Sequence, residues 1–202
     1  MLTILLLATI ALLCQCKAHS LDYVEAQYQK PVPQRISKFI NAAYNPLVKE
    51  QQLSSSHSIS IEPLNTDDAV FCSYTSPDTG RVIFSLVQKE TDDLVLNIGV
   101  RYTFGSEKNV LVLNSRKNGV WGEEIRPSGF DFSPNIQVNL VVSVGDAGFD
   151  IFTIDNNGVA QYIATFPYRP GLPVSLVNLI RIVSDGNSGV DNVGLGVFFA
   201  NQ

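Results

Sequence analysis

The sequence is poor in the residues from which proteins build disulfides, metal sites and catalytic centres. Its 202 residues include three cysteines, one tryptophan and two histidines, His19 and His57. Two histidines do not supply a zinc cluster or a histidine-based nucleophile system. The chain also lacks an Asn-x-Ser/Thr sequon, so N-glycosylation is not expected. We therefore predict no metal, no cofactor and no enzymatic activity.

Basic charge and long apolar runs are scarce as well. The formal net charge is −5, which disfavours nucleic acid and anionic membranes as partners. The apolar run from residue 2 to residue 13 is shorter than the roughly 20 residues that span a bilayer. It fits a signal peptide over residues 1–18, so we predict a secreted, extracellular protein without membrane insertion. Cys14 and Cys16 then leave with the signal, and Cys72 is expected to be a small buried hydrophobe.

Residues 19–56 are predicted to be an N-terminal extension rather than a domain. Residues 34–43 favour one short helix, because apolar side chains recur at positions i, i+3, i+4 and i+7. These side chains are Ile36, Phe39, Ile40 and Ala43. The run Ser54-Ser55-Ser56 then reads as a linker. The remaining residues, 57–202, are expected to form one domain.

That domain is predicted to be all-β. Short apolar runs alternate with turn residues, and no helical segment comes between them. The expected strands are 57–62, 69–75, 81–88, 93–102, 109–114, 136–144, 149–155, 159–166, 175–183 and 192–199. Many strands at regular spacing indicate a two-sheet antiparallel β-sandwich. Asp67-Asp68 and Asp92-Asp93 are expected to lie in its loops as solvated charge.

The run 93–102 shows which side chains face the core. Alternation predicts five residues on the buried face, namely Leu94, Leu96, Ile98, Val100 and Tyr102. Asn97, Gly99 and Arg101 then point outward. Val112 and Asn114 on the next strand can share that outer face.

The segment after Asn114 combines the only tryptophan with hydrogen-bonding side chains. A turn is expected over residues 116–119, and Trp121 follows it, with Glu124 and Arg126 shortly after. A flat aromatic ring can cover the apolar face of a sugar ring, while carboxylate, guanidinium and carboxamide groups bind its hydroxyls. Trp121 can share a face with Glu124 and Arg126 only if the strand is irregular near Gly122, where a bulge costs little.

Over residues 57–199 these features resemble the galectin family, most specifically between residues 94 and 126. The family's Val-x-Asn corresponds to Val112 and Asn114, and its Trp-Gly-x-Glu-x-Arg runs from Trp121 to Arg126. Its His-x-Asn-x-Arg strand keeps only the arginine, Arg101. The resemblance implies a jelly-roll sandwich, galectin- or concanavalin-like, that binds β-galactosides without metal.

The resemblance also implies a role for each matching residue. Trp121 would stack on a galactose ring, and Asn114 would bond its exocyclic hydroxyl. Arg101 would reach the axial hydroxyl and the ring oxygen. Glu124 would orient Arg101 and Arg126. The expected carbohydrate-binding residues are thus Asn97, Arg101, Val112, Asn114, Trp121, Glu124 and Arg126, and the expected partners are extracellular glycans or glycoproteins.

Two departures leave an alternative open. Asn97 stands where the family has histidine, and Gly99 where it has asparagine. Losing one or two hydrogen bonds at about 1 kcal/mol each would weaken binding by roughly one to two orders of magnitude. The gap at Gly99 could instead admit a substituted sugar. The competing hypothesis is a galectin-fold module that has lost sugar binding and serves as a protein-interaction or structural domain. A weak lectin site would need homodimerisation or clustering for avidity.

An enzyme acting on sugars is the least favoured reading. A glycosidase needs two carboxylates on either side of the scissile bond. Glu123 and Glu124 are adjacent in the sequence, so on a strand they would face opposite sides.

Overall fold

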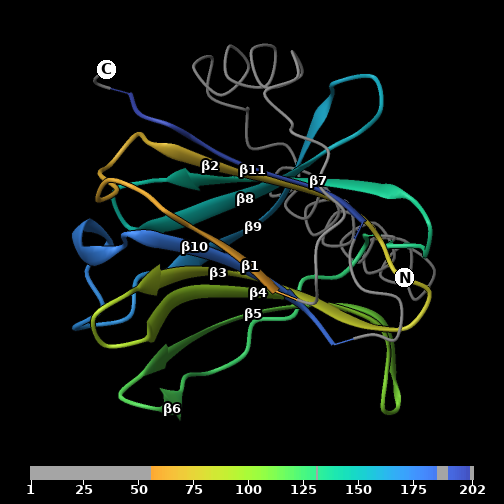
Figure 1. Ribbon diagram of the computed structural model, residues 1–202, viewed down its shortest axis with the longest axis horizontal. Helices are drawn as coiled ribbons and strands as arrows, with labels where there is room; N and C mark the ends of the chain where they lie inside the picture. Colours follow the sequence, from red (N-terminus) through yellow and green to blue (C-terminus); the bar gives the residue numbers. More distant parts are fainter. Residues whose placement is uncertain (1–55, 131, 186–190, 201–202) are drawn as a thin grey trace, which may run out of the picture.

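The structure is a computed structural model that describes residues 56–130, 132–185 and 191–200, and these residues form two antiparallel sheets packed face to face (Figure 1). In spatial order the six-stranded sheet is β1 (Ser56–Ser60), β10 (Leu179–Ser184), β3 (Gly80–Gln88), β4 (Asp93–Phe104), β5 (Glu107–Lys117) and β6 (Val120–Trp121). The five-stranded sheet is β11 (Asp191–Phe198), β2 (Ala69–Thr75), β7 (Gln137–Val144), β8 (Gly148–Ile154) and β9 (Ala160–Pro167).

This architecture confirms the predicted all-β, two-sheet sandwich. One turn of 3-10 helix, η1 (Val174–Leu176), is the only helical element in the described ranges. No helix there is long and apolar enough to cross a membrane. The predicted signal peptide, the helix over residues 34–43 and nearly all of the extension lie outside the described residues. Those boundaries stay predictions.

Most predicted strands coincide with the observed ones to within two residues at each end, and two differ more. The segment predicted as strand 175–183 begins with η1, which follows Pro173, and becomes extended only at Leu179. The segment predicted as strand 109–114 is longer at both ends, because β5 pairs with β4 as far as Phe104–Glu107 and with β6 as far as Lys117–Val120. The two-residue strand β6 was not predicted as a strand.

The core lies between the inward faces of the two sheets, and alternation predicts it well along most of β4. Leu96, Ile98 and Val100 are at most 1% exposed and belong to this core. Leu94 is buried as predicted, at 5% exposed, but it does not face this core. The register of β4 shifts between Leu94 and Asn97, which reverses the parity. Leu94 therefore packs in a separate cluster with Val87 and Leu179.

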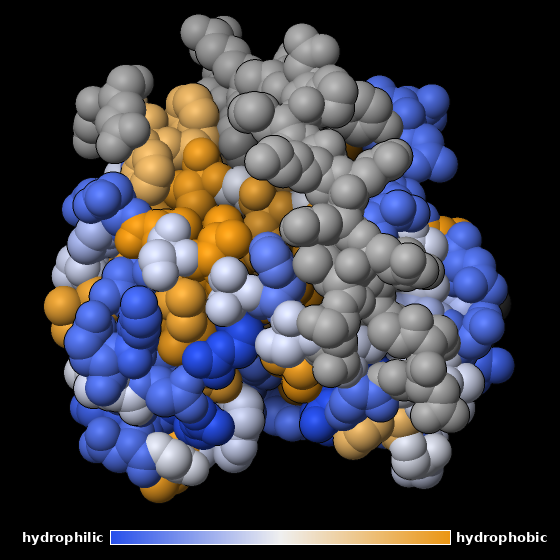
Figure 2. All heavy atoms as spheres, viewed as in Figure 1, coloured by the Kyte–Doolittle hydropathy of each residue, from blue (hydrophilic) through white to orange (hydrophobic). Residues whose placement is uncertain are grey.

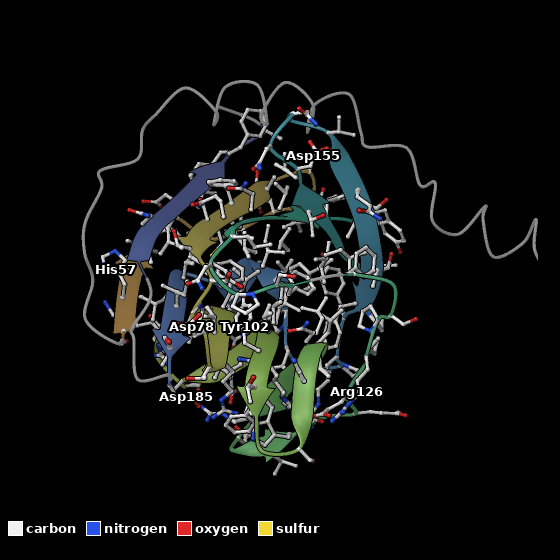
Figure 3. All side chains as sticks on the ribbon, turned by 90° about the vertical axis from the view of Figure 1, so that its right-hand side faces the viewer. His57, Asp78, Tyr102, Arg126, Asp155 and Asp185 are labelled. Atoms are coloured by element: carbon white, nitrogen blue, oxygen red, sulfur yellow. The ribbon has the colours of Figure 1, made fainter. Side chains whose placement is uncertain are left out.

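Two buried tyrosines connect the sheets through their hydroxyl groups. The Tyr74 and Tyr102 oxygens are 3.0 Å apart, and Figure 3 shows Tyr102 in the interior between the layers. Burial raises the pKa of both phenols. Cys72, on β2, is fully buried, which confirms it as a small hydrophobe, and burial raises the pKa of its thiol. The core thus holds without a disulfide among the described residues.

Candidate functional site

The outward face of the six-stranded sheet brings together the residues predicted on β4 and β5. Cross-strand pairing aligns Asn97 with Asn114, Gly99 with Val112, and Arg101 with Val110. Because alternate residues share a face, Asn97, Arg101, Val112 and Asn114 lie on one patch, as predicted. Figure 2 shows the surface around β3 to β6 as mainly hydrophilic.

A tight hairpin places Trp121 at the edge of this patch. Asn118 and Gly119 both have positive φ, 50° and 79°, as a two-residue turn between β5 and β6 requires. The turn is therefore shorter than the four residues predicted. Trp121 pairs with Arg116, whose guanidinium carbon lies 5.7 Å from the centre of the indole ring. The tryptophan is 49% exposed, so it presents apolar surface to solvent instead of filling the core.

The irregularity predicted near Gly122 is present. Pairing runs from Arg116–Trp121 to a bridge between Leu113 and Ile125, which offsets the register by one residue. Gly122 donates its N–H to the Ser115 carbonyl at 2.9 Å. The offset turns Ile125 toward the core and leaves Glu124 within reach of Arg101 on the outer face.

Two guanidinium groups and two carboxylates form a closed network at one side of the patch. Glu124 accepts from Arg101 Nη2 at 3.2 Å and from Arg126 Nε at 2.9 Å. Glu107 accepts from Arg126 Nη1 at 2.5 Å and also from Arg101. Hydrogen bonding to Arg126 is the largest cause that lowers the pKa of both glutamates, and Arg101 lowers both pKa values further. Figure 3 shows Arg126 near the β4–β5 hairpin, with His57 on the opposite edge of the sheet.

Glu107 belongs to the site but was not among the predicted site residues. Alternation along β5 places Glu107 on the opposite face from Val112 and Asn114, and Glu107 pairs with Phe104 and not with Arg101. The strand pattern therefore gave no reason to connect it with the patch. Its distance from Arg101 along the sequence could have identified it. A carboxylate six residues after an arginine, across the turn at Gly105, can reach back to that arginine.

Asn114 is held in one orientation by the backbone. It is 5% exposed, and its Oδ1 accepts from the Ser115 N–H at 2.7 Å. None of the described residues accepts from its Nδ2, which leaves that donor for a ligand. Asn97, in contrast, donates its Nδ2 to the Ser85 hydroxyl at 2.9 Å, so part of its hydrogen-bonding capacity is already used.

A second group of ion pairs is centred on Asp92, in the turn between β3 and β4 of the same sheet. Asp92 accepts from Arg116 at 2.6 Å and from Arg181 at 2.8 Å, and these interactions lower its pKa, with the Arg181 hydrogen bond contributing most. Its neighbour Asp93 is 5% exposed and accepts from the Asn118 N–H at 2.6 Å. The expectation that this pair carries only solvated loop charge was therefore wrong.

The same correction applies to Asp68. It is 2% exposed, and it accepts from the Asn65 and Ala200 N–H groups at 2.7 and 2.9 Å. Within the described ranges, no three His, Cys, Asp or Glu side chains gather as a metal-binding group.

Comparison with known proteins adds independent findings. A family model described as galactoside-binding lectin matches residues 48–193. Galectin-1 of Sus scrofa is 29% identical over 112 residues, which cover 55% of this chain and 76% of that protein. A galactose-binding lectin of Chondrilla caribensis is 25% identical and covers 65% of this chain and 92% of its own length.

Solved structures agree with these sequence matches. A tetrameric galectin from the ball sponge Cinachyrella sp. superposes with a TM-score of 0.59 at 29% identity, covering 71% of this chain and 99% of its own. Congerin II with lactose and MES has a TM-score of 0.56 at 22% identity, covering 70% of this chain and 99% of its own, a likeness of fold.

Proposed function

Because the chain belongs to the galectin family of galactoside-binding lectins, we propose that the patch around Trp121 binds β-galactosides without a metal ion. The family is one of lectins, not of enzymes. The observation that carries the proposal is the network of Arg101, Glu107, Glu124 and Arg126 beside an exposed tryptophan.

Each group has a physical task in this proposal. The exposed indole of Trp121 covers the apolar C–H face of a pyranose ring. Asn114 donates from Nδ2 to a ring substituent, because its oxygen is already bonded to the backbone. Arg101 is 15% exposed at its side chain and is held from two sides by carboxylates, so it offers N–H donors in a fixed geometry. A preorganised arginine loses less side-chain entropy when the sugar binds.

We further propose that the protein acts outside the cell on glycans or glycoproteins. The apolar N-terminal run supports secretion, with residues 1–18 as the signal peptide. A shallow single site gains from multivalency, so self-association as a homodimer or a larger assembly is expected. The tetrameric state of the sponge galectin supports this expectation.

The test is lactose binding by the protein recovered from culture medium, whose N-terminal sequence also reports the cleavage site. Trp121 is the only tryptophan, so its fluorescence follows the site directly. We expect a saturable change with lactose. Arg101→Ala should weaken binding by at least ~100-fold, because two charge-assisted hydrogen bonds contribute about 1.5–3 kcal/mol each. Trp121→Leu, measured by calorimetry, should also bind more weakly.

Lys108→Ala is the matched control, because Lys108 is an exposed cation on β5 outside the patch. It should bind lactose as the native protein does. If the folded native protein shows no fluorescence change at tens of millimolar lactose, the proposal of a β-galactoside-binding lectin is contradicted. That result would favour the alternative of a protein-interaction module. The departures from the family pattern at Asn97 and Gly99 also favour this alternative.

A further inference from the structure

An apolar row crosses the outer face of the six-stranded sheet next to the proposed sugar site. Cross-strand pairing places Val183 of β10 opposite Ile83 of β3, Ile83 opposite Gly99, and Gly99 opposite Val112 of β5. Val183 and Ile83 are partly exposed, and neither belongs to the core between the sheets. We call these four residues the apolar row.

Gly99 is the lowest point of this row. The glycine itself is buried, yet a Cβ built on it would meet only the Val112 carbonyl oxygen, at 3.9 Å. The space above its backbone therefore admits a methyl-sized group without a close contact, and we call this space the recess. Its floor is backbone, and its nearest neighbours along the row are the aliphatic side chains of Ile83 and Val112.

Polar rows lie on both sides of the apolar row. On one side, pairing aligns Arg181, Ser85 and Asn97. On the other side, Arg81 lies opposite Arg101, and its guanidinium sits 4.3 Å from the ring centre of Phe104. A ligand bound over the apolar row would meet hydrogen-bonding groups on both sides and aliphatic side chains between them.

This arrangement discriminates between substituents on a bound sugar. A hydroxyl placed over the recess would leave water without gaining a side-chain partner from Gly99 or Ile83, which is unfavourable. A methyl group placed there would bury apolar surface against Ile83 and Val112, the neighbours of Gly99 in the row. A buried methyl-sized group improves affinity by about fourfold.

We propose that the apolar row accepts an uncharged, methyl-bearing substituent on the galactose-type ring, either an acetamido or an O-acetyl group. Gly99 is then the specificity-determining residue, because a side chain there would fill the recess. The inference rests on the proposed function, since the sugar must first be held by the patch around Trp121.

Calorimetry with four disaccharides tests this specificity on the whole secreted protein. The probes are lactose, its analogue with a 2-acetamido group on the galactose, 3′-O-acetyl-lactose and 3′-O-sulfo-lactose. We expect one of the two acyl-bearing sugars to bind about three- to tenfold more tightly than lactose. The acetamido and O-acetyl probes distinguish the two sources of the methyl group.

Two variants connect the preference to the apolar row. Gly99→Asn should abolish the preference and bind lactose more tightly, because the carboxamide fills the recess and adds a donor and an acceptor. Ile83→Thr replaces the partly exposed aliphatic side chain beside the recess with a polar one, and it should reduce the preference by about twofold. The thermal unfolding midpoint of each variant checks that the fold is intact.

Three results would overturn the inference. Equal affinity for lactose and both acyl-bearing sugars would show that the recess does not bind the methyl group of either substituent. Tighter binding of the sulfated probe than of either acyl-bearing sugar would assign selectivity to Arg181 and its row. If neither the native protein nor Gly99→Asn binds any of the four sugars, the proposed function fails, and this inference fails with it.

Discussion

The outer face of the six-stranded sheet has two halves that are built differently. The charged half consists of Arg101, Glu107, Glu124 and Arg126, together with Asn114 and Trp121. The neutral half consists of Ser85, Asn97, Gly99 and Ile83. In the charged half every ionic group touches two partners of opposite sign. In the neutral half the structure has one side-chain hydrogen bond, between Asn97 and Ser85.

This difference indicates how affinity and selectivity are divided. The closed network fixes the donors of Arg101 before a ligand arrives, so the charged half can supply most of the binding free energy. The neutral half offers few donors and a recess at Gly99, so it can discriminate between ligands of similar affinity. Changes in the charged half should therefore affect all galactosides together, and changes in the neutral half should alter their order.

After Arg101→Ala, the largest effect is expected from Glu124→Gln. The substitution keeps the size of the side chain but removes the charge that orients Arg101 and Arg126. Weakening two charge-assisted contacts should lower lactose affinity by roughly 30- to 100-fold. The stability of the fold should change by about 0–1 kcal/mol, because partly exposed ion pairs contribute little. Isothermal titration with lactose and thermal unfolding measure the two effects.

Glu123→Gln is the control for this substitution, since it removes the adjacent exposed carboxylate. Its lactose affinity should match that of the native protein. Equal losses in both variants would mean that overall charge, and not the network, controls binding.

Acidification should disable the charged half without altering the neutral half. The pKa values of Glu107 and Glu124 are lowered from 4.5 by their arginine partners. A lowered pKa means that the network's contribution to stability is complete above pH 4.5 and is lost as the pH falls through the folded-state pKa. Lactose affinity should stay level from pH 8 to pH 5 and decrease only below pH 4.5. A midpoint above pH 5 would contradict this assignment.

The sequence predicted the faces of the strands wherever alternation was unbroken. It placed Asn97, Arg101, Val112 and Asn114 on one surface because β4 and β5 pair regularly there. It also predicted the bulge that brings Trp121 to the same surface, because Gly122 marked the place. It assigned Leu94, which is buried, to the wrong face, because a register shift occurs there without a glycine to signal it.

The partners at the strand ends could not be predicted from periodicity. Glu107 lies just after a hairpin turn, and Asp92 has a positive φ of 56° between β3 and β4. At such positions alternation no longer decides where a side chain points. Asp92 contacts Arg116 of β5 and Arg181 of β10, which lie on either side of the β3–β4 hairpin in the sheet. These contacts depend on the order of the strands, which periodicity does not predict.

The smallest effect is expected from Gly122→Ala, which disturbs the charged half without removing any of its polar groups. A Cβ at this position would lie 3.2 Å from Asn114 Oδ1, 3.3 Å from Ser115 Oγ and 3.4 Å from Arg169 Nη1. These neighbours must shift by a few tenths of an ångström, so Asn114 would present its Nδ2 slightly out of place. We expect lactose affinity to decrease by about threefold, which corresponds to part of one hydrogen bond.

The matched control is Gly196→Ala on the five-stranded sheet, where an added Cβ meets nothing within 4 Å. Its lactose affinity should be unchanged, and its stability should be equal or slightly higher, because alanine reduces the entropy of the unfolded chain. Lactose titration and thermal unfolding of both variants distinguish a local displacement from a general loss of packing. If Gly122→Ala binds lactose as tightly as Gly196→Ala does, the position of Asn114 does not depend on the glycine beneath it. The bulge would then serve only to turn Trp121 and Glu124 onto one face.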